Sequence, residues 1–161
     1  MAIVAKVKQN PGLIALYRSD DLSLLATYPT GALPDMVTFS SDGQTILSAN
    51  EGEPSSDYAN DPEGSVTIID LSQGYVEKAV VKLVSLSLFN DGKSRYNESG
   101  INVRTAGPTG TSLAQDLEPE YLALNRDDTK AYVALQENNA IAIIDIATAH
   151  WFVHARYACQ L

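Results

Sequence analysis

Residues 117–134 read Leu-Glu-Pro-Glu-Tyr-Leu-Ala-Leu-Asn-Arg-Asp-Asp-Thr-Lys-Ala-Tyr-Val-Ala and repeat the pattern of residues 31–49, which read Gly-Ala-Leu-Pro-Asp-Met-Val-Thr-Phe-Ser-Ser-Asp-Gly-Gln-Thr-Ile-Leu-Ser-Ala. Pro34 falls on Pro119, and Asp42 falls on Asp127. Each stretch holds two apolar, alternating runs around an Asp-containing turn. This pattern predicts a β-hairpin in each stretch.

A further strand follows each hairpin. Residues 140–146, Ala-Ile-Ala-Ile-Ile-Asp-Ile, repeat residues 65–71, Ser-Val-Thr-Ile-Ile-Asp-Leu, and residues 13–17 are a weaker copy. With an outer strand, the unit is a four-stranded antiparallel sheet, and repetition of such a unit is typical of β-propeller blades. A jelly roll or sandwich has similar strand counts but does not explain the repeat. The sequence therefore predicts an all-β fold, an open fragment of about two to three β-propeller blades.

The blade pattern divides the 161 residues into parts of one incomplete domain. We expect a partial blade at 1–30, a blade at 31–90 with an acidic loop at 50–63, an insertion at 91–115, the next blade at 116–148 and an atypical tail at 149–161. The tail holds the only Trp, the only Cys and both His residues: Trp151, Cys159, His150 and His154. We interpret it as foreign to the blades; an outer strand of unusual composition is the alternative.

The net charge of the chain restricts the kinds of partner that it can bind. The formal net charge is −9, which argues against nucleic acid and anionic membrane surfaces. No apolar run reaches the length of a membrane helix, so we expect no membrane insertion of this chain. The N-terminus lacks the pattern of a secretory signal, so the signal of an exported parent protein would lie outside this chain.

Carboxylates cluster in two matching places along the repeat. The acidic loop and the start of the next blade supply the candidate metal ligands Glu51, Glu53, Asp57, Asp61, Glu63, Asp116, Glu118 and Glu120, with Glu137 and Asn138 nearby in the second unit. Calcium takes six to eight such oxygen ligands, although the spacing fits no EF-hand. The pattern makes calcium the candidate cofactor, and a solvated acidic surface is the alternative.

Catalytic motifs are missing from the repeated region. Both imidazoles lie in the tail, so no Ser-His-Asp or Cys-His arrangement is expected there. We therefore assign no catalytic residues and no organic cofactor. Phosphoester hydrolysis on a metal-bound water stays open as an alternative; it would need phosphate-binding cations, of which Lys93, Arg95 and Arg104 in the insertion are the few available.

Several motifs resemble the choice-of-anchor I family: Ala-Asn-Glu-Gly-Glu-Pro at 49–54, Asp-Pro-Glu-Gly-Ser-Val-Thr-Ile-Ile-Asp-Leu at 61–71, Gln-Asp-Leu-Glu-Pro-Glu-Tyr at 115–121 and Leu-Gln-Glu-Asn-Asn-Ala at 135–140. The resemblance runs from about residue 12 to residue 148. It implies a propeller of a cell-surface protein related to the mesenchyme-specific cell surface glycoproteins.

The resemblance also implies an extracellular or cell-surface location and a non-enzymatic role in recognition or adhesion, with a protein or glycan as the ligand. Some relatives are described as alkaline phosphatase or phytase-like, which makes a calcium-dependent phosphoesterase the alternative function. Because two blades cannot close a ring, we also expect uncovered blade faces that favour self-association.

Overall fold

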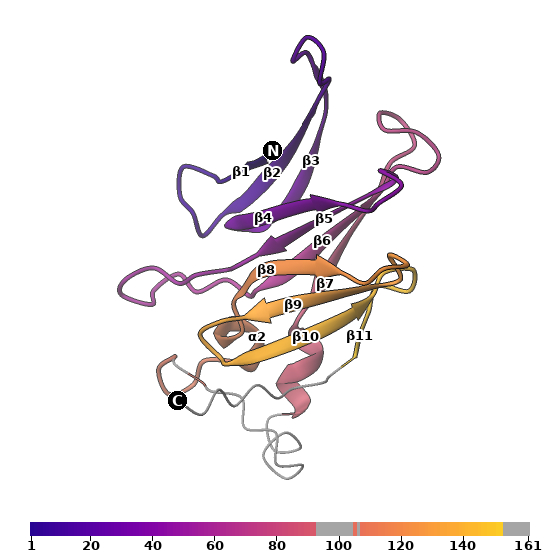
Figure 1. Cartoon of the computed structure of the whole chain (residues 1–161). Coiled ribbons are helices and arrows are strands. Elements are labelled where there is room, and N and C mark those ends of the chain that lie inside the picture. Colours follow the sequence, from indigo (N-terminus) through magenta and orange to yellow (C-terminus); the bar gives the residue numbers. More distant parts are fainter. Residues whose placement is uncertain (93–104, 106, 153–161) are drawn as a thin grey trace.

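A computed structural model describes residues 1–92, 105 and 107–152, which form three antiparallel sheets (Figure 1). The first sheet contains β1 (Ala2–Ile3), β2 (Pro11–Tyr17) and β3 (Leu24–Ala32). The second contains β4 (Pro34–Phe39), β5 (Thr45–Asn50), β6 (Ser65–Asp70) and β7 (Val80–Ser85). The third contains β8 (Pro119–Leu124), β9 (Lys130–Leu135), β10 (Ala140–Asp145) and β11 (His150–Phe152). Two short helical segments, η1 (Ser87–Gly92) and α2 (Leu113–Asp116), lie between the second and third sheets in sequence.

The predicted repeat is confirmed strand by strand. The two repeated stretches form the hairpins β4–β5 and β8–β9, and the strands that follow them are β6 and β10. Their registers agree, since Ala49 pairs with Val66 in the second sheet and Ala134 pairs with Ile141 in the third. The all-β fold class, with blade-like antiparallel sheets, is therefore confirmed.

The hairpin turns are built by side chains that hydrogen-bond to nearby backbone. In the first hairpin, Asp42 Oδ1 accepts from the Gln44 N–H (2.9 Å). In the second, Asn125 Oδ1 accepts from the N–H groups of Thr129 (2.9 Å) and Lys130 (2.8 Å). The Asp42 contact is an Asx turn, and the Asn125 contacts close the longer turn; such side-chain-to-backbone bonds explain the frequent Asp and Asn in these loops. The two turns also touch, because the Ser41 N–H donates to Asp128 Oδ2 (2.7 Å).

The main core lies between the second and third sheets. Side chains from β5, β6 and β7 pack against side chains from β8, β9 and β10; the buried members include Leu47, Val66, Ile68, Leu122, Val133 and Ile144. Burial of each such aliphatic side chain contributes roughly 1.5–3 kcal/mol. A smaller cluster of Ile14, Tyr28, Ile46 and Ile69 joins the first and second sheets. The second sheet is thus covered on both faces.

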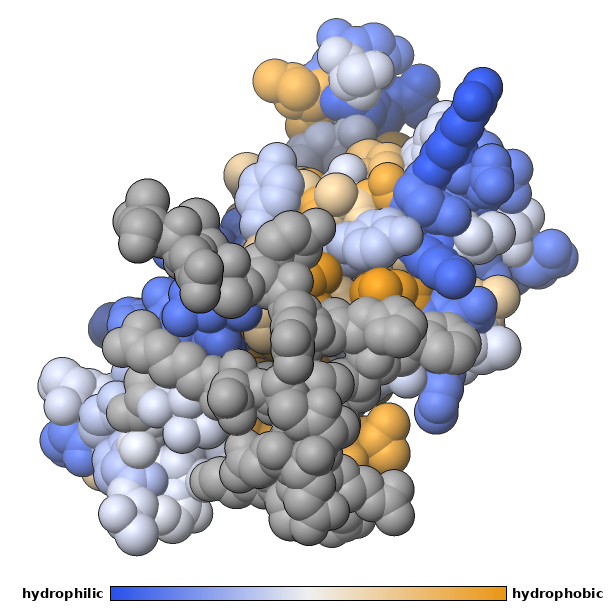
Figure 2. All heavy atoms as spheres, turned by 60° about the horizontal axis from the view of Figure 1, so that its bottom comes forward, coloured by the Kyte–Doolittle hydropathy of each residue, from blue (hydrophilic) through white to orange (hydrophobic). Residues whose placement is uncertain are grey.

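The third sheet keeps an apolar face toward solvent in the described part of the chain. Tyr121 is 63% exposed and Tyr132 is 41% exposed. Figure 2, which turns the lower end of Figure 1 forward, shows apolar residues at the surface among strongly hydrophilic ones. In the repeat, Tyr132 takes the place of Leu47, which the third sheet buries. Self-association through such a face stays a prediction.

The start of the expected atypical tail belongs to the third sheet. Trp151 pairs with Ile144, which makes His150–Phe152 the outer strand β11. Its buried indole Nε1 donates to the Ser85 carbonyl (2.8 Å), and its ring meets Phe89 edge to face at 5.8 Å. The interpretation of residues 150–152 as foreign is therefore wrong, and the alternative of an outer strand holds for them. Residues 153–161, with His154 and Cys159, lie outside the described part.

The Trp151 contacts predict a measurable contribution to stability. In Trp151→Phe the Ser85 carbonyl loses its donor and the smaller ring leaves a gap, so we expect the free energy of unfolding to fall by about 1–3 kcal/mol. Tyr132→Phe, an aromatic change on the exposed face of the same sheet, should alter it by less than about 0.5 kcal/mol. Urea unfolding followed by far-UV circular dichroism measures both. Equal effects of the two substitutions would contradict this role of Trp151.

Candidate functional site

Acidic side chains from the second and third sheets meet at the junction between them. We call this group the carboxylate cluster; its members are Asp35, Glu51, Glu53, Glu118, Glu120 and Glu137. Glu51 and Glu53 follow β5, while Glu118 lies directly before β8. Asp35 and Glu120 lie in β4 and β8, and Glu137 lies in the turn between β9 and β10. The cluster therefore draws on both copies of the repeat.

A β-bulge at the same place in both sheets sets the position of two members. The pairing of β4 with β5 shifts between Pro34 and Met36, and the pairing of β8 with β9 shifts between Pro119 and Tyr121. The residues at these shifts are Asp35 and Glu120. A bulge leaves one residue unpaired and re-aims its side chain, so the repeat carries an acidic side chain at an equivalent irregularity in each sheet.

The acidic loop after β5 is fixed at both of its ends. At its start, the Glu51 N–H donates to the Leu33 carbonyl (2.9 Å). At Gly52 the backbone is left-handed (φ 73°), and a Cβ there would lie 2.8 Å from the Gly64 nitrogen at the far end of the loop. Only glycine fits this close approach without strain. The loop therefore leaves and re-enters the sheet at one point, which holds Glu51 near the next sheet.

Buried polar side chains hold the end of β5 in place. Asn50 is fully buried, and its Nδ2 donates to Ser65 Oγ (3.1 Å) and Thr67 Oγ1 (2.9 Å) on β6. Its Oδ1 accepts from the Ser48 hydroxyl (3.3 Å). A buried amide with partners on both of its polar atoms is satisfied. This network orients the strand end from which Glu51 emerges.

The segment around α2 attaches the acidic loop to the third sheet. The Gly64 N–H donates to the Ala114 carbonyl (2.9 Å), and Gln115 Nε2 donates to the Asp61 carbonyl (2.8 Å). A Cβ on Gly64 would overlap the Leu117 carbonyl oxygen and come within 2.6 Å of the Pro119 ring. The backbones of the two sheets thus approach closely beside the cluster.

A second buried amide, Asn138, fixes the start of β8. Its Nδ2 donates to the Asp116 carbonyl (2.7 Å), and its Oδ1 accepts from the Glu118 N–H at 3.4 Å. Asn138 follows β9, as Glu51 and Glu53 follow β5, so the same end of each sheet supplies the cluster and its supports.

Burial and mutual repulsion raise three pKa values in the cluster. Burial, then the charges of Glu53, Asp35 and Glu137, raises the pKa of Glu51 from 4.5 to about 7. Burial, then Glu137 and the two loop glutamates, raises the pKa of Glu118 to about 7. Burial and a hydrogen bond with Glu137 raise the pKa of Glu120 to about 7. These shifts mean that the folded chain keeps protons on half-buried carboxyls that the unfolded chain would release.

One lysine lies against the cluster. Lys8 Nζ donates to Glu53, and this hydrogen bond raises the pKa of Lys8. The Lys8 charge also lowers the pKa of Glu51, although repulsion and burial outweigh it. The pair is well exposed and contributes little to stability. Lys8 therefore compensates only part of the negative charge.

The other predicted ligands lie in different hydrogen-bonded settings. Asp57 caps its own turn, accepting from Ser55 Oγ (2.7 Å) and the Ala59 N–H (3.1 Å), and these bonds lower its pKa. Glu63 accepts from Ser85 Oγ (3.1 Å).

Asp61 and Asp116 form a pair next to the cluster. Burial and the Asp116 charge raise the pKa of Asp61, and Asp116 accepts from the Gly107 N–H. The structure thus gathers Glu51, Glu53, Glu118 and Glu120 at the junction, and Asp116 lies beside them, since its charge also raises the pKa of Glu118. Asp61, Asp116 and Glu118 line one small pocket.

Sequence reasoning missed two members of this neighbourhood. The repeat alignment places Asp35 on Glu120, so it could have identified Asp35 as a second acidic bulge residue. Nothing in the sequence signals Lys8, because its approach depends on how the first sheet packs. The cations Lys93, Arg95 and Arg104, considered for phosphate binding, lie outside the described residues.

The arrangement is suited to attracting positive charge. Within residues 1–92, 105 and 107–152, no three acidic, His or Cys side chains converge closely enough to hold a metal ion as they stand. The charges of these carboxylates nevertheless act on one another and raise one another's pKa values. A cation bound there would relieve their repulsion and draw them together.

These features define a domain of stacked, blade-like antiparallel sheets with a carboxylate cluster at one junction. Residues 1–153 match the family model of the choice-of-anchor I domain. The chain therefore belongs to the choice-of-anchor I family, whose domain is associated with the cell surface. The match includes β11, beyond the end of the resemblance seen at residue 148.

No curated protein and no solved structure gave a match. Among the described residues, no helix is long and apolar enough to cross a bilayer.

The raised pKa values predict a pH dependence of stability. Between about pH 4.5 and about 7 the folded chain binds more protons than the unfolded chain, so stability falls as the pH rises through this window. Glu118→Gln removes one of the ionising groups and should make the fall of the melting temperature shallower. Glu77→Gln, an exposed change in the β6–β7 connection, should leave the slope unchanged. A melting temperature that rises across this window in the wild-type chain would contradict the shifts.

Proposed function

We propose that this domain is a non-enzymatic recognition or adhesion module of a cell-surface protein, and that the carboxylate cluster binds a cation, with calcium as the best candidate. The observation that carries the proposal is the set of three half-buried glutamates whose pKa values rise to about 7 at a junction between two sheets. Burial raises these pKa values most and repulsion between the carboxylates adds to it, so a cation that enters the site would stabilise the charged form of the glutamates.

The donor set favours calcium over other cations. Carboxylate and backbone oxygens are hard ligands, which calcium accepts in varied geometry and completes with water. Magnesium requires tighter octahedral geometry, which a loop and a strand end from different sheets are less suited to supply. The buried amide Asn50 fixes the strand end on the second-sheet side of the junction, and the buried amide Asn138 fixes the segment before β8 on the third-sheet side.

The recognition role rests on family membership together with the chemistry of the described residues. The described cluster is made of carboxylates and one lysine, a chemistry suited to binding a cation. The ligand we propose is a protein or glycan at the cell exterior, with the bound cation ordering the loop that presents Tyr58 and Pro54. Tyr58 is 43% exposed in that loop, and aromatic residues are common anchors in recognition surfaces.

Calorimetry and thermal melting with calcium test the proposal. We expect saturable heat of binding, and at a hundredfold excess of calcium over its dissociation constant a gain of about 2.7 kcal/mol in stability. The double variant Glu51→Gln, Glu118→Gln should lose both signals, while its metal-free melting temperature stays equal or rises because repulsion is removed. Glu77→Gln is the matched control and should respond like the wild-type chain.

Two results would contradict the proposal. If millimolar calcium gives neither heat of binding nor a shift of the melting temperature, the cluster is a solvated acidic surface and not a cation site. Hydrolysis of p-nitrophenyl phosphate that a chelator abolishes and calcium restores, and that the double variant lacks, would replace the binding role with the phosphoesterase alternative.

A further inference from the structure

Lys8 places a positive charge against the carboxylate cluster. Its Nζ donates to Glu53, and this hydrogen bond, followed by the charges of Glu53, Glu51 and Glu118, raises the pKa of Lys8. Glu51 and Glu53 follow β5 of the second sheet, whereas Glu118 lies directly before β8 of the third. One ammonium group therefore interacts with carboxylates from both sides of the junction. The chain itself supplies an example of a cation held at this cluster.

The ammonium group is carried by residues 4–10, the connection between the paired strands β1 and β2. Next to Lys8, the side-chain Nε2 of Gln9 donates to the Glu53 carbonyl (3.1 Å). Two neighbouring side chains of the connection thus bind the side chain and the backbone of the same residue in the acidic loop. The first sheet is therefore attached to the cluster at Glu53.

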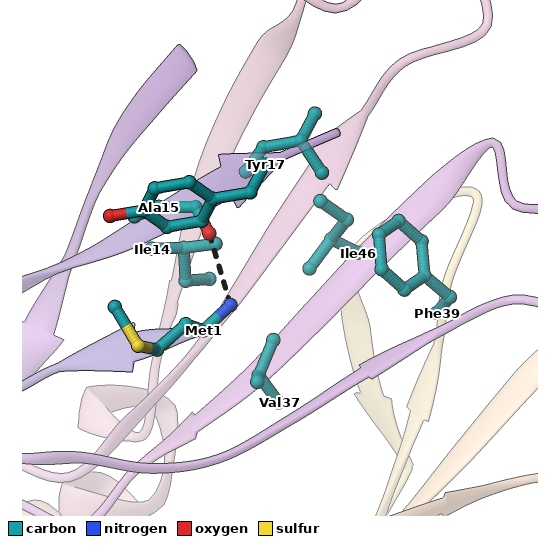
Figure 3. A pocket seen from close by; sticks show the side chains of 8 residues that line it. Met1, Ile14, Ala15, Tyr17, Val37, Phe39 and Ile46 are labelled. Atoms are coloured by element: carbon teal, nitrogen blue, oxygen red, sulfur yellow. Dashed lines mark hydrogen bonds between the residues drawn. The ribbon is translucent and has the colours of Figure 1, made fainter. Parts of the chain in front are cut away.

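Few packing contacts hold this connection in place. The side chains of Lys8 and Glu53 are 46% and 40% exposed, and neither residue of β1 is fully buried. The first sheet also packs on the second beside a cavity of about 250 Å³, with Met1 on one side of it and Val37 and Ile46 on the other (Figure 3). Segments with few buried apolar contacts open at a low cost in free energy. Lys8 can therefore leave the cluster while the cores of the sheets stay intact.

A metal ion at the cluster would compete with this ammonium group. Glu53 accepts the hydrogen bond of Lys8 and also belongs to the proposed cation site, so a cation that takes Glu53 replaces that hydrogen bond. The charge of Lys8 also repels a second cation near Glu51 and Glu118, because like charges repel at every separation. Both effects weaken the binding of the cation.

We propose that Lys8 is an internal competitor of the cation and sets how tightly the carboxylate cluster binds it. The inference rests on the proposed cation site. In the cation-free chain Lys8 pairs with Glu53. When a divalent cation such as calcium enters, Lys8 leaves and residues 4–10 are released from the acidic loop. The lysine thus shifts the site toward the weaker affinities that are found in extracellular calcium-binding modules.

Isothermal titration calorimetry of the full 161-residue chain with calcium tests this role. The titration is made at about 0.15 M ionic strength, where charges more than about 8 Å apart are largely screened. In Lys8→Gln the dissociation constant should fall by about two- to fivefold, the change expected when one exposed ion pair no longer has to be broken. Lys8→Arg keeps the charge and should bind calcium like the wild-type chain.

Lys6→Gln is the matched control, because it removes the same charge from the same connection. No ion pair among the described residues involves Lys6. The variant should therefore change the dissociation constant much less than Lys8→Gln does.

Nuclear magnetic resonance follows the release of Lys8 directly. Saturation of the wild-type chain with calcium should shift the side-chain Cε signal of Lys8 and the backbone amide signal of Gln9. The Cε signal of Lys6 should stay where it is.

The outcomes separate this inference from the proposed cation site. Equal dissociation constants for the wild-type chain and Lys8→Gln, or a Lys8 signal that calcium leaves unmoved, overturn the role of Lys8 and leave the cation site standing. Equal gains in Lys8→Gln and Lys6→Gln also overturn it, since net charge alone would then explain them. Absence of calcium binding in the wild-type chain and in every variant overturns the cation site and this inference with it.

Discussion

The packing of the second sheet on the third is the constraint on which the structure depends. The shared core from Leu47 to Ile144 brings the two sheets face to face, and Gly64 lets their backbones approach at Leu117 and Pro119. Since both sheets repeat one pattern, this packing also brings the acidic residues of the two sheets near one another at the junction. Apolar burial thus holds together carboxylates that would separate in an unfolded chain.

The same constraint explains why the cluster is a binding site in our account rather than a strained surface. Exposed acidic loops relax by moving apart, but Glu51 and Glu118 are anchored through backbone hydrogen bonds and through Asn50 and Asn138. Burial of these carboxyls, together with their mutual repulsion, therefore appears as raised pKa values. A bound cation and a bound proton are alternative ways to relieve it, which links cation affinity to pH.

Much of the fold could be predicted from the sequence, because strands and turns follow local patterns. The apolar alternation of residues 34–49 and 119–134, and the turn residues between, are enough to predict hairpins. β11 could not be predicted in the same way: its stability comes from Trp151 reaching Ser85 and Phe89, which are far away in the sequence. The small helix α2 lies next to a polar insertion and depends on a capping box at Ser112 and Gln115 that periodicity does not reveal.

The candidate site was predictable only in part for the same reason. Glu51 and Glu118 occupy strand ends of consecutive repeats, so their meeting follows from blade stacking. Asp57 and Glu63 lie in the same loop as Glu51 but accept hydrogen bonds from Ser55 and Ser85 instead of joining the cluster. The acidic composition of the loop could not show which of its carboxylates belong to the cluster. Lys8 reaches the cluster from the first sheet, a contact that no spacing in the sequence encodes.

The central claim is that sheet packing forces these carboxyls together. Carbon-13 NMR of the glutamate side-chain carboxyls, recorded across a pH titration of the calcium-free chain, tests it most directly. The account predicts that Glu51, Glu118 and Glu120 titrate near pH 7. Titration of all three near 4.5, their ordinary value, would contradict it.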